Sequence, residues 1–257
     1  MEPDSTPVTP ATTQDLFLGG RLTIHQPADG YRAGMDALVL GAAVAGLEAA
    51  TAADVGCGVG TAMLAAATLA QTTCFAGIER EPGAAALARR NVGANALDGR
   101  VRVVEADALL PAPELAGAFD LVFSNPPFFD DLRAIRPPSQ ARMAAWVAGV
   151  PLEDWLKAML KLAAPKGQLL LLHRAERLGE ILAWLPGRAG DVRVYPLRPA
   201  ADQPAKRVLV LARKGSRAPL RLLRGLDLHP ADADTGRFTP EADAVFAGAA
   251  LPGWPGS

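Results

Sequence analysis

Short apolar runs alternate regularly with longer helical segments in this sequence, and few folds are compatible with such a pattern. The apolar runs are bounded by Gly, Pro or charged residues, as buried strands are. The expected strands are 51–57, 72–79, 101–106 and 119–124, and the expected helices between them are 61–71 and 81–97. This alternation predicts a parallel sheet with helices on both faces, because each connection between parallel strands must cross over the sheet.

The rest of the chain extends this pattern and adds one reversal. The further expected elements are helices at 151–163 and 175–185 and strands at 167–173, 191–197 and 206–213. The loop between the last two strands is too short for a crossover helix, so the last strand should run antiparallel. A hairpin at 16–26 and a buried helix at 35–50 come before the alternation. The predicted fold is therefore α/β: a Rossmann-like, doubly wound, mostly parallel seven-stranded sheet with an antiparallel last strand.

Residue usage excludes several functional classes. The 257 residues include only two cysteines and three widely separated histidines, so neither a disulfide framework nor a metal site is expected. The apolar stretches are interrupted before they reach membrane-spanning length. The segment 1–14 is acidic and rich in Pro and Thr, unlike a signal peptide, and is expected to be a disordered tail. These features predict a cytoplasmic, metal-free protein.

Positive charge is concentrated in one segment near the end of the chain. Residues 188–224 contain ten Lys or Arg and two acids, a net charge of +8, so the other residues carry −9 of the total of −1. A basic block on a nearly neutral protein indicates a polyanionic partner. A solvated surface of strands and turns would have the same composition, and composition alone does not separate the two interpretations.

A glycine-rich loop, DVGCGVG (54–60), follows the first strand of the alternation. Gly56, Gly58 and Gly60 allow a tight turn and the close approach of a ligand, so we expect all three to border a cofactor. A dinucleotide site would have the spacing G-x-G-x-x-G, whereas the spacing here is G-x-G-x-G with Asp54 in front. A carboxylate in this position would repel a pyrophosphate and would suit a cationic amino-acid group instead.

Two more acids are expected at the same edge of the sheet. Glu79 ends the second strand, where its carboxylate could accept hydrogen bonds from both hydroxyls of a ribose, and Asp107 follows the third strand, near an adenine. Ligands on such sheets bind at the carboxyl ends of the strands. We therefore expect Asp54, Glu79 and Asp107 to line one cofactor site. The alternative for the glycine loop by itself is a tight packing turn.

The fourth strand runs into SNPPFF (124–129), which should emerge beside this site. Pro126 and Pro127 stiffen the loop and hold the Asn125 side-chain carbonyl and the Pro126 carbonyl in place. Such acceptors suit a planar –NH2 group, because they orient its lone pair and stabilise positive charge that develops on the nitrogen. Phe128 offers a face on which a base can stack. The alternative is a rigid loop that merely ends the strand.

These motifs resemble those of class I S-adenosylmethionine-dependent methyltransferases. The glycine loop resembles the first motif of that class, and Glu79 and Asp107 match its ribose and adenine positions. N-P-P-F at 125–128 resembles the (D/N/S)-P-P-(Y/F/W) motif of amino-methyltransferases, which act on the exocyclic amines of bases or on glutamine amides. Phe128 replaces the common Tyr, which keeps the stacking face and loses a hydroxyl. The resemblance implies S-adenosyl-L-methionine as the cofactor.

The segment 25–43 resembles the N-terminal signature of one "small domain" group, the bacterial tRNA1(Val) (adenine-37-N6)-methyltransferases. This resemblance runs from about residue 15 to the end of the chain. It implies that 15–50 packs over the cofactor site of a methyltransferase domain at 51–257. Asp36, Tyr31 and Arg32 then become candidate pocket residues, although a simple packing helix is an alternative for this segment.

The same resemblance implies RNA, most simply tRNA, as the partner. The candidate phosphate-binding residues are Arg133 and Arg136 in the 130–146 loop, which we expect to be mobile without RNA, together with Lys206, Arg207, Arg213 and Lys214. Methylation of adenine N6 is the favoured reaction. Guanine-N2 methylation of ribosomal RNA and glutamine N5-methylation of a release factor are the alternatives.

Overall fold

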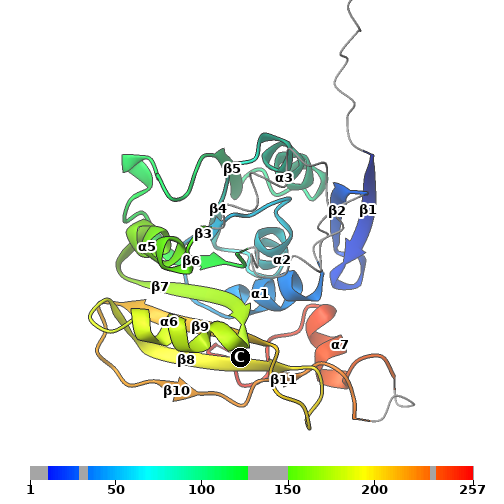
Figure 1. Cartoon of the computed structure of the whole chain (residues 1–257). Coiled ribbons are helices and arrows are strands. Elements are labelled where there is room, and N and C mark those ends of the chain that lie inside the picture. The colour runs from blue at the N-terminus through cyan, green and yellow to red at the C-terminus, as the bar shows by residue number, and fades with distance from the viewer. Residues whose placement is uncertain (1–10, 29–33, 127–149, 232–235, 257) are drawn as a thin grey trace, which may run out of the picture.

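The computed structural model describes residues 11–28, 34–126, 150–231 and 236–256. Its main element is a nine-stranded sheet with the order β10–β8–β9–β7–β6–β3–β4–β5, in which β11 also pairs with β8 (Figure 1). The strands are β3 (Thr51–Val55), β4 (Cys74–Glu79), β5 (Val101–Glu105), β6 (Phe119–Ser124), β7 (Ala163–Arg174), β8 (Ala189–Arg198), β9 (Arg207–Lys214), β10 (Arg221–Leu222) and β11 (Leu226–Asp227).

The predicted Rossmann-like topology is confirmed. Only β9 runs antiparallel to its neighbours β7 and β8, and every other described pair in this sheet is parallel. The predicted number of seven strands is wrong, because β10 and β11 add two short parallel strands to β8. Each of these strands has two residues, which is too short to show the alternation of apolar and polar residues by which strands are recognised.

β7 begins four residues earlier than expected. The strand starts at Ala163 and includes Pro165, and its pairing with β6 shifts register between Phe119 and Leu121. Lys166 has a φ of 64° within this irregular stretch. A proline predicts the end of a regular strand, and here it is accommodated by the irregularity in the ladder.

Helices cover both faces of the sheet (Figure 1). One face packs against α1 (Met35–Ala45), α2 (Thr61–Leu69) and α3 (Pro82–Ala94), and the other against α5 (Leu152–Leu162) and α6 (Leu178–Trp184). α1 and α2 are apolar nearly all round and lie in close contact: a Cβ added to Gly41 would lie 2.7 Å from the Ala65 Cβ. α5 is amphipathic, and Leu156 and Met159 on its apolar side are buried.

The N-terminal hairpin consists of β1 (Thr12–Phe17) and β2 (Leu22–Pro27), joined by a 3-10 turn at Leu18–Gly20. The hairpin was expected, but it begins at Thr12, so residues 12–14 belong to a strand and not to the tail. Asn91 of α3 and Asn95, the C-cap of this helix, bind the backbone of β2 as a neighbouring strand would. Asn95 contacts both the N–H and the C=O of Thr23, and Asn91 does the same at His25, at 2.7 to 2.9 Å.

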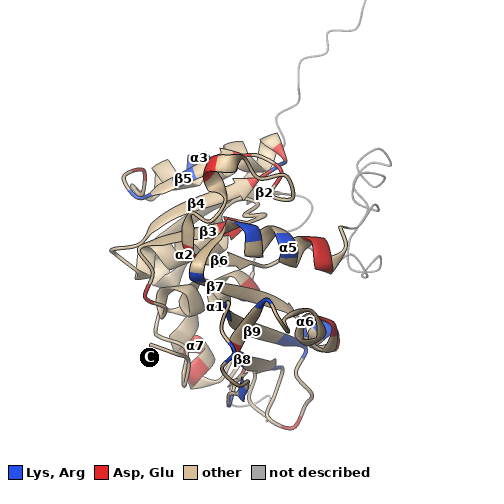
Figure 2. Cartoon of the chain, turned by 90° about the vertical axis from the view of Figure 1, so that its left-hand side faces the viewer, with Lys and Arg blue, Asp and Glu red and all other residues tan. Residues whose placement is uncertain are grey.

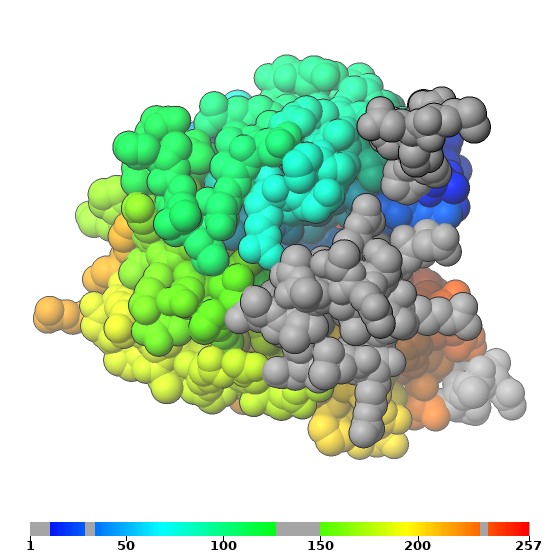
Figure 3. Space-filling view, turned by 45° about the horizontal axis from the view of Figure 1, so that its top comes forward, coloured from blue at the N-terminus to red at the C-terminus, as the bar shows by residue number. Residues whose placement is uncertain are grey.

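The C-terminal segment packs against α1, an arrangement that the sequence analysis did not predict. It includes α7 (Pro240–Phe246) and the buried residue Trp254. The Trp254 indole N–H donates to the Ala43 carbonyl (2.8 Å), and the Tyr195 hydroxyl donates to the Pro252 carbonyl (2.9 Å). Figure 3 shows the N-terminal hairpin (blue) next to the surface formed by α3 and β5, and well separated from the surface formed by β8 (yellow). Within the described ranges, no helix is long and apolar enough to cross a membrane.

Candidate active site

The candidate site lies where the strand order reverses, between β3 and β6. The connections from these two strands leave in opposite directions, so their carboxyl ends form the topological switch point at which such sheets bind ligands. The glycine loop follows β3, Asn125 follows β6, and Glu79 ends the adjacent strand β4. The structure therefore brings together at one edge the residues expected at the ends of four successive strands, β3 to β6, with Asp107 just beyond β5.

The glycine loop is shaped by backbone conformations that favour glycine. Gly56 and Gly58 have φ values of 70° and 55°, in the left-handed region. The N–H groups of Gly56 and Cys57 both donate to the Ile78 carbonyl, so the loop crosses the end of β4. A Cβ added to Gly58 would meet nothing within 4 Å, which means that this part of the backbone faces open space. A ligand can therefore approach the loop closely.

Gly60, the third glycine of the loop, differs from Gly58 in its surroundings. It is buried and forms the N-cap of α2 with a φ of 88°, and its N–H donates to the Cys57 carbonyl (2.9 Å). A Cβ added to Gly60 would lie 3.3 Å from the Leu64 Cδ1, so this side of the residue faces the core. The left-handed turn into the helix by itself favours glycine at this position.

Asp54 is a buried acid beneath this loop, with a relative exposure of 3%. Burial raises its pKa from 3.8 to about 8, the negative charge of Glu79 adds to this effect, and a hydrogen bond from the Met63 backbone N–H opposes it. The carboxyl group is therefore mostly protonated at neutral pH. A cationic group bound nearby would favour its ionised form.

The carboxylate of Glu79 is held in place by the loops around it. Its Oε2 accepts from the Gly58 N–H and its Oε1 accepts from the Glu81 N–H, both at 2.9 Å. Asp107 accepts from the Leu109 N–H (2.9 Å) through its Oδ1. Both carboxylates are only partly buried, so both can take up further hydrogen bonds from a ligand.

Asn125 has an unusual environment. Its side-chain oxygen Oδ1 is buried, and it has no hydrogen-bond partner within the part of the chain that the structure describes. Buried acceptors are normally satisfied, and an exception calls for an explanation. An acceptor of this kind at the carboxyl end of β6 is suited to bind an N–H donor that arrives with a substrate.

Trp155 is a site residue that the sequence analysis missed. It lies in the first turn of α5, and its ring packs on the glycine loop: a Cβ added to Gly56 would lie 2.9 Å from two of its ring atoms. Its indole N–H donates to the hydroxyl of Ser124, the residue before Asn125. The helical pattern identified this segment as amphipathic, but one tryptophan on an amphipathic helix gives no indication of which loop it contacts.

Asp36 and Arg207, which were expected to bind different ligands, form an ion pair. The Arg207 Nε lies 3.2 Å from the Asp36 Oδ2, and both side chains are 31% exposed. Arg207 pairs with Arg174 across the β7–β9 ladder, which places it at the carboxyl end of β7. The exposed Lys206 is the preceding residue in the chain. These residues thus lie at the same edge of the sheet as the glycine loop.

Arg213 and Lys214 lie at the opposite edge. Lys214 lies seven residue steps along β9 from Arg207, a distance of about 23 Å. The Lys214 ammonium donates to the carbonyls of Leu160 and Ala163, at the end of α5. Figure 2 shows the basic residues spread along β8 and β9. The four basic residues of this segment that were proposed from the sequence therefore do not form one patch.

Some of the predicted site residues lie outside the part of the chain that the structure describes. They are Pro127, Phe128, Arg133, Arg136 and the rest of the 130–146 loop, and Tyr31 and Arg32.

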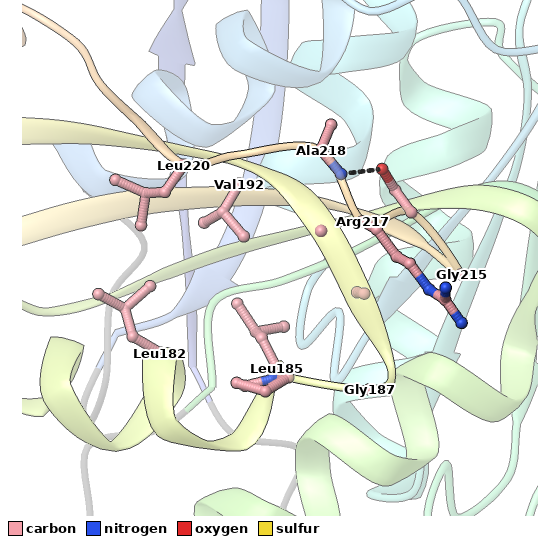
Figure 4. Close-up of a pocket in the computed structure, with 12 residues that line it drawn as sticks. Leu182, Leu185, Gly187, Val192, Gly215, Arg217, Ala218 and Leu220 are labelled. Carbon is pink, nitrogen blue, oxygen red and sulfur yellow. Dashed lines mark hydrogen bonds between the residues drawn. The ribbon is translucent and has the colours of Figure 1, made fainter.

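A cavity of about 580 Å³ also lies away from the glycine loop. It is formed by the end of α6, the start of β8 and residues 215–220, at the amino ends of the parallel strands. The apolar side chains of Leu182, Val192 and Leu220 converge on it, whereas Arg217 points away (Figure 4). We do not assign the cofactor to this cavity, because the glycine loop and the acids are at the other edge.

The fold and the residues at the β3–β6 edge define a class of enzyme, the S-adenosylmethionine-dependent methyltransferases. A family model described as the methyltransferase small domain matches residues 35–143. The chain is also 32% identical over 238 residues to a Porphyromonas gingivalis (strain ATCC 33277) protein described as tRNA1(Val) (adenine(37)-N6)-methyltransferase, covering 88% of this chain and 91% of that protein. The chain belongs to the methyltransferase small-domain family and is related to these tRNA methyltransferases.

Other comparisons agree with this family. A Yersinia pestis (strain Pestoides F) protein with the same description is 33% identical over 201 residues, which is 72% of this chain and 79% of that protein. The crystal structure of a predicted O-methyltransferase from Agrobacterium tumefaciens has a TM-score of 0.69 and 30% identity, covering 84% of this chain and 97% of that one. M. jannaschii TYW2 in complex with AdoMet has a TM-score of 0.59 and 14% identity, covering 80% and 86%, and shows the fold alone.

The protonated state of Asp54 leads to a testable pH dependence. Between about pH 4 and pH 8 the folded protein retains a proton on Asp54 that the unfolded chain has lost, so the stability from this site falls as the pH rises. We expect the free energy of unfolding of the cofactor-free protein, relative to that of Asp54→Asn, to fall with pH by up to about 1.4 kcal/mol per unit. Urea unfolding of both proteins at several pH values from 5 to 9 measures this difference.

The comparison with Asp54→Asn removes the effects of other groups. Burial, together with the nearby charge of Arg177, lowers the pKa of His173 to about 4, which gives a pH dependence of opposite sign between about pH 4 and 6.5. That contribution is common to both proteins and cancels in the difference. Parallel stability curves from pH 5 to 8 would show that Asp54 is ionised throughout.

Proposed function

We propose that the protein transfers a methyl group from S-adenosylmethionine to an exocyclic amino group, and that the acceptor is adenine N6 in a tRNA. The observation that supports an amino group as the methyl acceptor is the buried Oδ1 of Asn125. This oxygen has no hydrogen-bond partner among the described residues and lies beside the glycine loop. An amide oxygen accepts hydrogen bonds and suits an –NH2 group, whereas a hydroxyl acceptor needs a base to remove its proton. The choice of tRNA adenine is supported by the description of the Porphyromonas gingivalis relative.

The residues at this edge fit the cofactor. S-adenosylmethionine, when bound, supplies a methyl group carried on a positively charged sulfur. The open backbone at Gly58 would lie against the cofactor, and Asp54 would provide negative charge for its cationic part. Glu79, already oriented by two backbone N–H groups, would accept hydrogen bonds from the ribose hydroxyls, and Asp107 would contact the adenine.

Asn125 acts on the substrate in this mechanism. Its Oδ1 would accept a hydrogen bond from the substrate amine and so hold the nitrogen lone pair toward the methyl group. The same hydrogen bond becomes stronger as the nitrogen gains positive charge, which stabilises the transition state more than the bound substrate. No strong general base is required, because the proton can leave after transfer.

The direct test is transfer of labelled methyl groups. Incubation with S-adenosylmethionine and unmodified bulk tRNA should label the RNA, and nucleoside mass spectrometry should then detect N6-methyladenosine. N2-methylguanosine, or labelling of a release factor while tRNA stays unlabelled, would reject the proposed acceptor. In both outcomes Asn125 could still bind an –NH2 group. The test therefore identifies the acceptor molecule separately from the role of Asn125.

RNA binding gives a second test, based on two basic residues at the cofactor edge. We expect Lys206→Gln/Arg207→Gln to weaken tRNA binding and to reduce the slope of log Kd against log salt by about one for each phosphate that is no longer neutralised. We expect this change because the substitutions remove positive charge at the carboxyl end of β7 and the start of β9. Filter binding or fluorescence anisotropy at several salt concentrations measures the slope.

Arg213→Gln provides the matched control for this prediction. Arg213 is on the same strand, at the edge opposite the glycine loop, and its Nη1 donates to the Lys166 carbonyl (3.4 Å). The slope of log Kd against log salt for tRNA binding by Arg213→Gln should equal that of the wild type. A reduced slope for Arg213→Gln with an unchanged slope for the double variant would place the RNA on the other edge of the sheet.

A further inference from the structure

A chain of two hydrogen bonds connects α5, β6 and β3 just behind the candidate site. The Trp155 indole N–H donates to the Ser124 Oγ (2.9 Å), and the Ser124 hydroxyl donates to the Val55 carbonyl (2.7 Å). Ser124 is fully buried, with a relative exposure of 0%. An indole N–H can only donate and a serine hydroxyl carries one proton, so the direction of both bonds is determined.

Two of the three residues joined by these hydrogen bonds adjoin the two loops of the site. Ser124 immediately precedes Asn125, and Val55 immediately precedes Gly56. The Trp155 ring also packs directly on Gly56, where an added Cβ would lie 2.9 Å from the ring atoms Cη2 and Cζ2. One side chain of α5 therefore contacts both the glycine loop and Ser124, the residue that precedes Asn125.

Trp184 makes a useful contrast with Trp155. Both tryptophans lie in helices on the same face of the sheet, and Trp184 is 8% exposed. The Trp184 indole Nε1 is buried without a hydrogen-bond partner among the described residues. The removal of its N–H would therefore break no hydrogen bond in that part of the chain.

We propose that Trp155 is a positioning residue, which acts through Ser124 to hold the Asn125 side chain at a fixed distance from the glycine loop. The proposal rests on the proposed function for what Asn125 does. Trp155 itself need not touch the substrate. Its role is to set the distance between the acceptor oxygen and the cofactor loop, and displacements of about an ångström at such a position cost large factors in rate.

The test compares Trp155→Phe, Ser124→Ala and the double variant, with Trp184→Phe as the control. Trp155→Phe retains a ring on Gly56 and removes the N–H. We expect kcat for methyl transfer to fall about tenfold in Trp155→Phe and at least as much in Ser124→Ala. The double variant should be no slower than Ser124→Ala, because both substitutions break the same chain. The Kd for S-adenosylmethionine, measured by calorimetry, should stay within about twofold of the wild type.

Three outcomes would overturn the proposal. They are a kcat of Trp155→Phe equal to that of Trp184→Phe, independent effects that multiply in the double variant, and a rise in the cofactor Kd that accounts for the whole decrease in rate. The last outcome would mean that Trp155 supports the glycine loop alone. Ser124→Ala decides the question if Trp155→Phe does not fold.

A measurement without turnover separates this proposal from the proposed function. The side-chain NH2 signals of Asn125 in ¹⁵N-labelled protein can be identified by their disappearance in Asn125→Ala. These signals should shift in Trp155→Phe and in Ser124→Ala and stay in place in Trp184→Phe, even if the wild-type protein methylates no tRNA. Unshifted Asn125 signals in both variants would overturn the positioning role whatever the acceptor is.

Discussion

Replacing Asn125 by alanine is expected to lower kcat for methyl transfer by a factor of about 10² to 10³, with little change in the Kd for S-adenosylmethionine. Losses of this size follow the removal of one preorganised hydrogen-bonding group at a site where charge develops. The Asn125 Oδ1 is buried and has no partner among the described residues, so its removal leaves no other protein group without a partner there. Single-turnover transfer to tRNA and calorimetric titration of the cofactor measure the two quantities.

Asn125→Asp and Asn125→Ser serve as controls, because both side chains keep an oxygen that can accept a hydrogen bond. They should retain more activity than Asn125→Ala if acceptance is the role of this residue. An alanine variant that loses cofactor affinity in proportion to its activity would show instead that Asn125 binds the cofactor. An alanine variant with the kcat of the wild type would exclude Asn125 from the reaction.

Trp254→Ala should lower the free energy of unfolding by about 3 to 5 kcal/mol. Trp254 is 2% exposed and makes an edge-to-face contact with Tyr195, at 5.6 Å between the ring centroids. Its indole N–H donates to the Ala43 carbonyl, near the end of α1. The substitution removes a large buried ring and one hydrogen bond. Urea unfolding followed by circular dichroism measures the decrease.

Two further variants show where this stability comes from. Trp254→Phe removes the hydrogen bond to Ala43 and retains most of the ring, so its cost should be closer to about 1 to 3 kcal/mol. Leu222→Ala, at a leucine that is 71% exposed, should change stability by less than about 0.5 kcal/mol. A Trp254→Ala protein as stable as Leu222→Ala would mean that the C-terminal segment does not pack on α1 in solution.

Much of the fold followed from local patterns. The strands from β3 to β6 and the helices between them each have enough apolar residues to be recognised singly, and their alternation implies the crossover topology. β10 and β11 did not follow, because pairs of residues carry no periodicity. The packing of the C-terminal segment did not follow either, because Trp254 and Ala43 are 211 residues apart in the chain.

The chemical character of the candidate site follows from short segments of the sequence. Gly56 and Gly58 provide a loop that other residues cannot form easily, and Asp54, Glu79 and Asn125 place charged or accepting groups at the ends of strands. These are properties of short segments, in which neighbours along the chain set the conformation. The topology of a doubly wound sheet then brings the strand ends to one edge.

The roles of the three loop glycines could not be separated in this way. All three have a positive φ, which the G-x-G-x-G spacing favours, but the spacing does not say which of them faces a ligand. Gly58 borders open space, whereas Gly60 packs against Leu64 of α2. The difference depends on where the helix lies, which is a property of the packed structure.

Which distant side chains meet depends on the packing of the whole chain. Arg207 and Asp36 are 171 residues apart, and they form an ion pair because β9 runs antiparallel and begins near the start of α1. The basic residues 206–214 are close in sequence, yet an extended strand carries the two ends of this segment to opposite edges of the sheet. Trp155 reaches Ser124 and Gly56 because α5 packs across β6. Contacts of this kind depend on strand direction and helix packing, which the local pattern of residues does not encode.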